Sequence, residues 1–127
     1  SHVLFTSPRS VEYLRGPLEG KVVVAIGEGT AEELRKRGCA PCVAEAATQE
    51  GMIEWIERRG ERGFWCLPQS SRSRPLLSRY LRARGVPHYS FVLYETRLKK
   101  VEKPPRLEEF DEVFFTSPST VEAFRRI

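Results

Sequence analysis

The side chain best suited to acid–base chemistry in this sequence is that of Tyr94, near the end of the apolar run HYSFVLYET. The alternation in this run predicts a strand over residues 88–96, with Tyr94 at its carboxyl end and on the same face as Val92 and Thr96. A phenol in that position can donate a proton to a leaving group. It can also serve only as half-buried packing, which is the commoner use of such a tyrosine.

Further polar chemistry is expected where the predicted strands end, in turns rich in serine, threonine and glycine. Most of these turns lie at predicted helix N-termini, where free backbone N–H groups and the positive end of the helix dipole favour an anion. Each turn alone is explained by ordinary helix capping. Their repetition along one edge would suit a ligand with several carboxylates. The turns are TSPRS (6–10), GEGTA (27–31), PQSSRS (68–73), ET (95–96) and TSPST (116–120).

Other familiar site patterns are missing from the sequence. It contains no serine–histidine–aspartate arrangement, no nucleophile elbow and no HExxH motif, and GEGT is too short for a Walker or dinucleotide loop. Cys39 and Cys42 form a CxxC pair at the start of a predicted strand, but no second pair follows and both histidines are isolated. We interpret these cysteines as buried, reduced thiols and expect no metal site.

Alternating strands and helices must position the candidate side chains. Ser7 can cap a helix that starts at Pro8, and Thr30 with Glu33 at the third helical position matches a capping box. Thr48 is expected to start a third helix. Strands are predicted over residues 3–6, 21–27, 41–46, 63–68 and 88–96, and the later helices over residues 30–38, 48–60 and 75–85. The segment QSSRSR, which follows the fourth strand, is expected to be a polar turn.

This alternation predicts an α/β fold, with a parallel sheet flanked by helices and a flavodoxin-like winding. In such a sheet ligands bind beyond the carboxyl ends of the strands, where the turns described above lie. Residues 97–109 are charged, contain two prolines and lack periodicity, which predicts a linker. Residues 110–124 return to the strand-turn-helix pattern.

Length and charge narrow the classes of partner. The 127 residues suffice for one core, and the net charge of +4 comes from arginines dispersed among acidic residues. This pattern is typical of solvated helix faces, so we expect no nucleic acid partner. No apolar run approaches the roughly 20 residues that span a bilayer, and we expect no membrane association. We expect a cytoplasmic location, or an organelle matrix after import. Because the chain starts without methionine and stops within a predicted helix, we also expect a fragment.

One motif occurs twice, near the two ends of the chain. The stretches FTSPRSVEYL (5–14) and FTSPSTVEAF (115–124) share six of ten residues, and each follows a short apolar run. Each copy predicts a strand that ends in a serine-capped helix with proline at its first position. The repeat therefore points to two equivalent structural edges.

Five segments in this order resemble the uroporphyrinogen-III synthase family. They are FTSPRSVEYL, VVVAIGEGTAEELRKRG, TQEGMIEWI, VLYET and DEVFFTSPSTVEAF, and together they extend over nearly the whole chain. The resemblance implies two flavodoxin-like lobes joined by a hinge, with the active site in the cleft between them. It further implies cyclisation of the linear tetrapyrrole hydroxymethylbilane, with inversion of the last pyrrole and loss of water, and no metal or organic cofactor.

The same resemblance assigns roles to individual residues. Tyr94 matches the tyrosine of the family's YxT motif and becomes the candidate acid that assists departure of the hydroxyl. The substrate carries eight carboxylates, which agrees with the interpretation of the turns as anion sites. The matching substrate-binding candidates are Thr6, Ser7, Thr30, Ser70, Ser71, Arg72, Thr116 and Ser117.

Family members are longer than this chain, which affects the expected organisation. By analogy residues 1–96 form most of one lobe, and residues 97–127 form the hinge return and the first strand-helix unit of the second lobe. We expect a monomer for the full-length protein and pairing of two chains if this one is truncated. The alternative function is a non-catalytic flavodoxin-like module that binds an anion or a tetrapyrrole.

Overall fold

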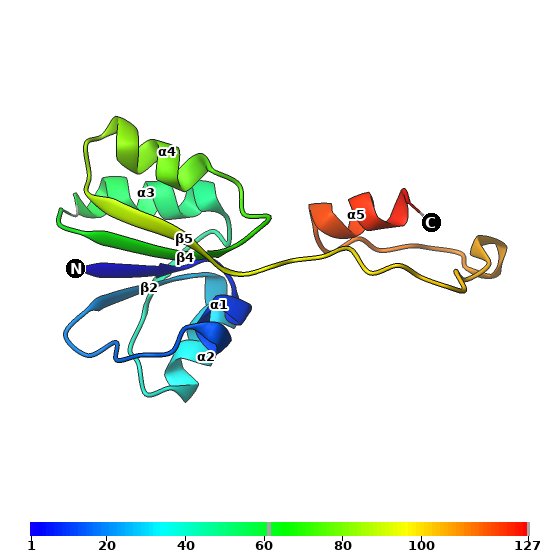
Figure 1. Cartoon of the computed structure of the whole chain (residues 1–127), viewed down its shortest axis with the longest axis horizontal. Coiled ribbons are helices and arrows are strands. Elements are labelled where there is room, and N and C mark those ends of the chain that lie inside the picture. Colours follow the sequence, from blue (N-terminus) through cyan, green and yellow to red (C-terminus); the bar gives the residue numbers. More distant parts are fainter. Residues whose placement is uncertain (61, 127) are drawn as a thin grey trace. The chain divides into compact units, whose positions relative to one another are not determined.

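The first part of the chain is built on a sheet of five parallel strands (Figure 1). The computed structural model describes residues 1–60 and 62–126, so residue 127 of the predicted second part lies outside the described residues. The sheet belongs to a compact unit, Ser1–Glu95, which confirms the flavodoxin-like α/β class expected from the sequence. The strands are β1 (His2–Phe5), β2 (Val22–Ile26), β3 (Cys42–Ala44), β4 (Trp65–Ser70) and β5 (His88–Tyr94).

Helices cover both faces of this sheet (Figure 1). Helices α1 (Pro8–Tyr13) and α2 (Gly27–Lys36) lie on one face, and α3 (Gln49–Arg59) and α4 (Leu76–Ala83) lie on the other. Because side chains alternate along a strand, β1 sends Val3 and Phe5 into the core under α1 and α2, and Leu4 into the core under α3 and α4. All three side chains are buried, as expected for a central parallel strand.

The strand order is β3-β2-β1-β4-β5, so the chain first builds outward from β1 to β3 and then crosses back to β4. Strand β1 therefore lies between β2 and β4. The connections from β1 to β3 add strands on one side of β1, and those from β3 to β5 add strands on its other side. In doubly wound sheets this switch point opens a crevice at the carboxyl ends of the two central strands. Here those ends carry Thr6 and Ser7 after β1, and Ser70 and Ser71 at the end of β4.

Two of the predicted helix starts are confirmed by their cap geometry. The Ser7 hydroxyl accepts a hydrogen bond from the Ser10 N–H at 3.2 Å, with Pro8 in the first helical position. Thr48 accepts from the Gly51 N–H at 3.1 Å at the start of α3. These caps are local in sequence, which is why the pattern predicts them.

The predicted capping box at Thr30 and Glu33 is wrong. Helix α2 begins at Gly27, directly after β2, so Thr30 lies inside the helix and is buried. The physical reason is the backbone of Gly27, whose φ of +73° lets the chain enter the helix without an intervening loop. Glu28 then supplies the acidic residue of the first turn and forms an ion pair with Arg35.

The expected polar turn after β4 starts later than predicted. Gln69 and Ser70 belong to the strand because β5 offers both of them partners, Val92 and Tyr94, across an irregularity in the ladder. The cysteines differ as well: Cys39 and Cys42 are free thiols, as expected, but half-buried instead of buried. Cys66 is also a half-buried free thiol. Burial raises the pKa of the Cys66 thiol.

A second unit comprises Thr96–Ile127 and contains a 3-10 turn, η1 (Leu107–Glu109), and helix α5 (Pro118–Phe124). Helix α5 carries a full capping box, in which Ser117 and Thr120 satisfy each other's backbone N–H groups. The strand expected before it is absent among the described residues of this unit, where residues 112–115 are irregular. A strand needs a neighbour with which to pair, and no described strand of this unit provides one.

Candidate functional site

The side chains of Ser7 and Tyr94 meet at the carboxyl edge of the sheet. The Ser7 Oγ lies 2.7 Å from the Tyr94 Oη, and either hydroxyl can donate. Ser7 is held there as the cap of α1, and Tyr94 is held as the last residue of β5. Tyr13, from the last turn of α1, packs its ring 5.5 Å from that of Tyr94. Two candidates separated by 87 residues thus form one polar pair beside an aromatic contact.

The turn after β4 is adjacent to this pair. Ser70 is opposite Tyr94 in the ladder, and the Ser71 N–H donates to the Tyr94 carbonyl at 2.9 Å. The Arg72 N–H donates to the Ser70 hydroxyl at 3.2 Å, which closes the turn on itself. The structure therefore brings Ser7, Tyr94, Ser70, Ser71 and Arg72 to one region, in which the Ser71 and Arg72 N–H groups already have acceptors.

The remaining candidates are placed differently. Thr6 follows β1 directly and is half-buried, whereas Thr30 is buried inside α2 with 2% of its surface exposed. Thr116 and Ser117 lie in the second unit, where Thr116 is exposed and Ser117 caps α5. Their expected participation with the others in one site stays a prediction.

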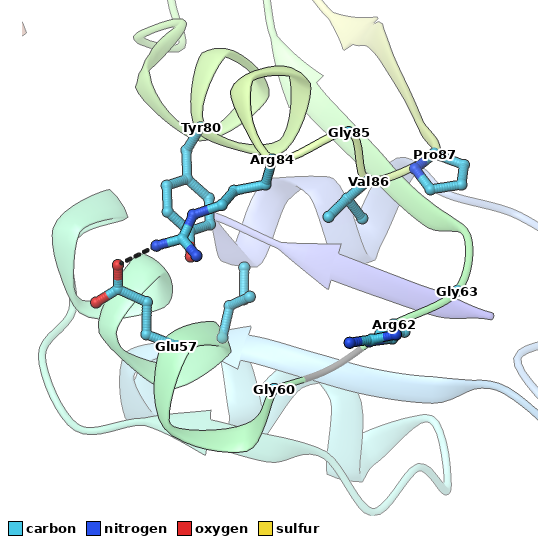
Figure 2. Close-up of a pocket in the computed structure, with 10 residues that line it drawn as sticks. Glu57, Gly60, Arg62, Gly63, Tyr80, Arg84, Gly85, Val86 and Pro87 are labelled. Carbon is cyan, nitrogen blue, oxygen red and sulfur yellow. Dashed lines mark hydrogen bonds and ion pairs between the residues drawn. The ribbon is translucent and has the colours of Figure 1, made fainter.

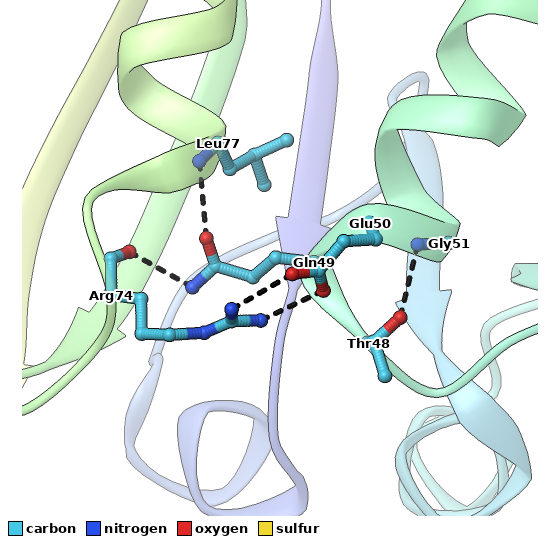
Figure 3. Close-up of polar contacts among 6 residues, drawn as sticks. All are labelled: Thr48, Gln49, Glu50, Gly51, Arg74 and Leu77. Atoms are coloured by element: carbon cyan, nitrogen blue, oxygen red, sulfur yellow. Dashed lines mark hydrogen bonds and ion pairs between the residues drawn. The ribbon is translucent and has the colours of Figure 1, made fainter.

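Two residues of α3 that sequence analysis did not single out reach the same turn (Figure 3). The buried Gln49 side chain donates to the Arg74 carbonyl at 2.9 Å and accepts from the Leu77 N–H at 3.0 Å. The Glu50 carboxylate accepts two hydrogen bonds from the Arg74 guanidinium, each 2.8 Å long. No local pattern could have found these contacts, because their partners are 24 to 28 residues away.

The contact between Glu50 and Arg74 stabilises the charged form of both side chains. The Arg74 guanidinium, which donates to the carboxylate, lowers the pKa of Glu50 to about 2. The same hydrogen bonds raise the pKa of Arg74. Glu50 and Arg74 are therefore both ionised at neutral pH, and they form the bidentate geometry that is the strongest form of such a pair.

A separate pocket of about 470 Å³ lies at the opposite, amino end of the sheet, between the C-terminal ends of α3 and α4 (Figure 2). Its arginines suggest an anion site, but Arg84 forms an ion pair with Glu57 at 3.2 Å and covers the Tyr80 ring at 5.2 Å. Two helix C-termini also face this region, and their carbonyl ends favour cations. Arg84 is explained by its contacts with Glu57 and Tyr80 without any ligand.

Comparison with known proteins decides the family. A family model described as uroporphyrinogen-III synthase HemD matches residues 1–127, which is the full length of the chain. The chain belongs to the uroporphyrinogen-III synthase family. No curated protein gave a match, and no solved structure did.

Membership in the uroporphyrinogen-III synthase family gives the candidate site a chemical context. The family's function is part of porphyrin biosynthesis, and it implies a small tetrapyrrole as the substrate of this chain. Helices suited to crossing a bilayer, with enough length and apolar character, do not occur within residues 1–60 or 62–126.

Proposed function

We propose that this chain acts as a uroporphyrinogen-III synthase, which closes hydroxymethylbilane into a ring, inverts the last pyrrole and releases water. The observation that carries the proposal is the family match over all 127 residues. It is supported by the polar pair of Ser7 and Tyr94, which lies beside the switch point where ligands bind in sheets of this class. We place the protein and this reaction in the cytoplasm.

In the proposed first step Tyr94 acts as a general acid. Its phenol gives a proton to the hydroxyl of the terminal hydroxymethyl group, the carbon–oxygen bond breaks, and water leaves. The azafulvenium cation that remains is attacked by the substituted carbon of the last pyrrole, which gives a spiro intermediate. That intermediate fragments and closes again with the pyrrole inverted, and the proton released at the newly bonded carbon restores the phenol. Proton donation of this kind contributes typically about 10²- to 10⁴-fold to a rate.

Ser7 supports Tyr94 in this proposal through the direction of one hydrogen bond. The Ser7 oxygen accepts from the Ser10 N–H, and its own hydrogen can go either to the Ser10 Oγ at 3.4 Å or to the Tyr94 oxygen at 2.7 Å. In this proposal it goes to the closer partner, Tyr94. In that arrangement the phenol proton is directed to the substrate, and the Ser7 O–H stabilises the phenolate that forms. This is electrostatic stabilisation by a donor held in place before the reaction starts.

The remaining candidates bind carboxylates in this proposal. Ser70, Ser71 and Arg72 form the turn beside Tyr94, and Thr6 follows the neighbouring central strand. Thr116 and Ser117 complete the substrate-binding set that the family resemblance implies. Thr30, which is buried inside α2, belongs to that set on the resemblance alone. Because the substrate is a flexible chain, most of the rate gain is expected from holding it in one curled geometry.

Substitution of Tyr94 tests the catalytic role. We expect Tyr94→Phe to lower kcat for hydroxymethylbilane conversion by about 10²-fold or more, since it removes the proton and leaves the ring. Tyr89→Phe is the matched control, because Tyr89 lies on the same strand but is 60% exposed near its other end. Equal rates for Tyr94→Phe and the wild-type chain, with both folded by circular dichroism, would remove Tyr94 from the mechanism.

A further inference from the structure

The turn between β4 and α4, residues 71–75, is held from outside by two consecutive residues of α3 (Figure 3). At its first end, the Ser71 N–H is bound to the Tyr94 carbonyl of the neighbouring strand. At its last end, Arg74 is bound through its carbonyl by Gln49 and through its guanidinium by Glu50. The short span that contains Arg72 is therefore fixed on both sides.

Gln49 also replaces a missing cap. Helix α4 has Pro75 at its N-cap position and no side-chain cap of its own. The Gln49 Oε1 accepts from the Leu77 N–H, so an amide from α3 satisfies one of the free N–H groups at this helix start. Gln49 is 7% exposed; its hydrogen bond with the Leu77 N–H is buried, and the one with the Arg74 carbonyl is partly buried. Loss of a hydrogen bond costs more free energy when the polar group is buried than when water can replace the partner. Gln49 therefore has little freedom to move.

Glu50 adds a directional contact on the surface. Its two oxygens accept from the two terminal nitrogens of Arg74, so that the guanidinium plane and the carboxylate plane are fixed relative to each other. Glu50 itself is held by the first turn of α3, whose N-cap is Thr48. The ion pair therefore ties Arg74, and with it the turn, to the capped first turn of α3.

We propose that Gln49 and Glu50 are positioning residues, which hold the β4–α4 turn so that Ser70, Ser71 and Arg72 present their polar groups together to one carboxylate of the substrate. This inference rests on the proposed function for the identity of the ligand. Gln49 and Glu50 do not touch the substrate in this account. They act through Arg74 and through the start of α4.

The direction of the effect separates this role from simple electrostatics. Removal of the Glu50 charge takes a negative group away from an anionic substrate and releases Arg74, and both changes alone would strengthen binding. Loss of positioning would weaken it. Glu50→Gln keeps the shape of the side chain, removes its charge and turns one of its two acceptor oxygens into an NH2 donor, so the paired contact with Arg74 is lost. The sign of the change in KM is therefore diagnostic.

A matched control exists at the other end of the same helix. Glu57 also lies on α3 and forms an ion pair with an arginine after α4, Arg84, but near the amino end of the sheet. Glu57→Gln therefore removes a link between the same two helices without touching the β4–α4 turn. The double variant E50R/R74E exchanges the two charges and is expected to restore part of the link.

The test combines hydrogen–deuterium exchange of residues 70–76 with steady-state kinetics on hydroxymethylbilane. We expect Glu50→Gln to speed exchange in this turn and to raise KM about two- to fivefold at unchanged kcat, the range that an exposed ion pair supports. Glu57→Gln is expected to change neither quantity, and E50R/R74E to reverse part of both effects. Gln49→Ala is expected to give a larger exchange effect, because its contacts are buried or partly buried.

Three results would overturn the positioning role: unchanged exchange in residues 70–76, a KM that falls in Glu50→Gln, or an equal KM increase in Glu57→Gln. Failure of the proposed function has a different signature. The wild-type chain would then not accelerate conversion of hydroxymethylbilane at all, while exchange in the turn would still respond to Glu50→Gln and not to Glu57→Gln. That combination would rule out hydroxymethylbilane as the substrate and would still support the role of Glu50 in holding the turn.

Discussion

The hydroxyl of Ser7 combines two tasks that are usually assigned to different residues. As an acceptor it caps α1 through the Ser10 N–H, and this cap fixes the position of its oxygen. At 2.7 Å from the Tyr94 oxygen, the same group is available as a donor to the proposed acid. Replacement of Ser7 would therefore affect both the start of a helix and the charge that develops on Tyr94, whereas replacement of Tyr94 by phenylalanine affects only the latter.

Glu50 makes the stability of the fold depend on pH in a defined window. Its pKa is near 4.5 ordinarily and falls to about 2 in the folded chain because Arg74 binds the ionised form. The ion pair therefore contributes fully above about pH 4.5, and its contribution is lost as the pH falls from there towards 2. We expect the difference in unfolding free energy between the wild-type chain and Glu50→Gln to shrink across this window, as measured by urea unfolding at several pH values.

A difference that stays constant between pH 4.5 and pH 2 would show that Arg74 does not stabilise the ionised carboxylate of Glu50. Glu57→Gln again serves as the comparison, since Glu57 pairs with Arg84 at 3.2 Å through a single hydrogen bond. Added salt should reduce the contribution of both pairs, because each lies at the surface.

The junction between β2 and α2 depends on the glycine at its start. Gly27 has a φ of +73°, and a Cβ at this position would lie 2.8 Å from the Cβ of Ala47. Gly29, two residues later, has no such neighbour within 4 Å and lies inside the helix. We expect Gly27→Ala to destabilise the fold by about 1–2 kcal/mol or more, from backbone strain and the close contact.

Gly29→Ala is the internal control for this junction and should change stability in the opposite direction, by about 0.5–1 kcal/mol, because alanine favours a helix interior over glycine. Urea unfolding of both variants provides the measurement. Equal effects of the two substitutions would mean that α2 does not begin at Gly27, contrary to its placement here.

The elements that were predictable from sequence are those specified by local signals. The β-branched run of β2, the Ser7 and Thr48 caps and the positive-φ Gly60 at the end of α3 lie within a few residues of the features they determine. The contact of Ser7 with Tyr94 was not predictable at the atomic level, although the family motif and the topology placed both residues at one edge. The start of α2 was mispredicted because threonine is a common N-cap residue, whereas Thr30 is packed inside the helix.

The contacts of Gln49 illustrate what sequence patterns cannot supply. A glutamine at the first position of a helix is ordinary, and nothing near it indicates that its amide will cap α4, which begins 27 residues later. Such a contact becomes visible only when the crossovers place α3 beside α4 on one face of the sheet (Figure 1). The polar link of Figure 3 is therefore a consequence of topology and not of local pattern.

The two copies of the FTSP motif have different surroundings in the two units. Phe5 of the first copy is fully buried within a sheet, while Phe115 of the second copy is 43% exposed and packs on Phe124 of its own helix. Every buried apolar residue identified among the described residues belongs to Ser1–Glu95. Both copies nevertheless form the same serine-capped helix start, through Ser7 and Ser117. The prediction that Thr6 and Ser7 share one binding site with Thr116 and Ser117 follows from the family resemblance and stays a prediction.

The most direct test of the proposed function is the isomer formed from hydroxymethylbilane. Without a catalyst this substrate closes spontaneously to the type I ring, in which the last pyrrole is not inverted. We expect the intact chain to accelerate closure and to give mainly the type III isomer, as measured by chromatographic separation of the oxidised porphyrins. A product that stays type I, formed at the spontaneous rate in the presence of the folded chain, would contradict the enzymatic function and leave a tetrapyrrole- or anion-binding module in its place.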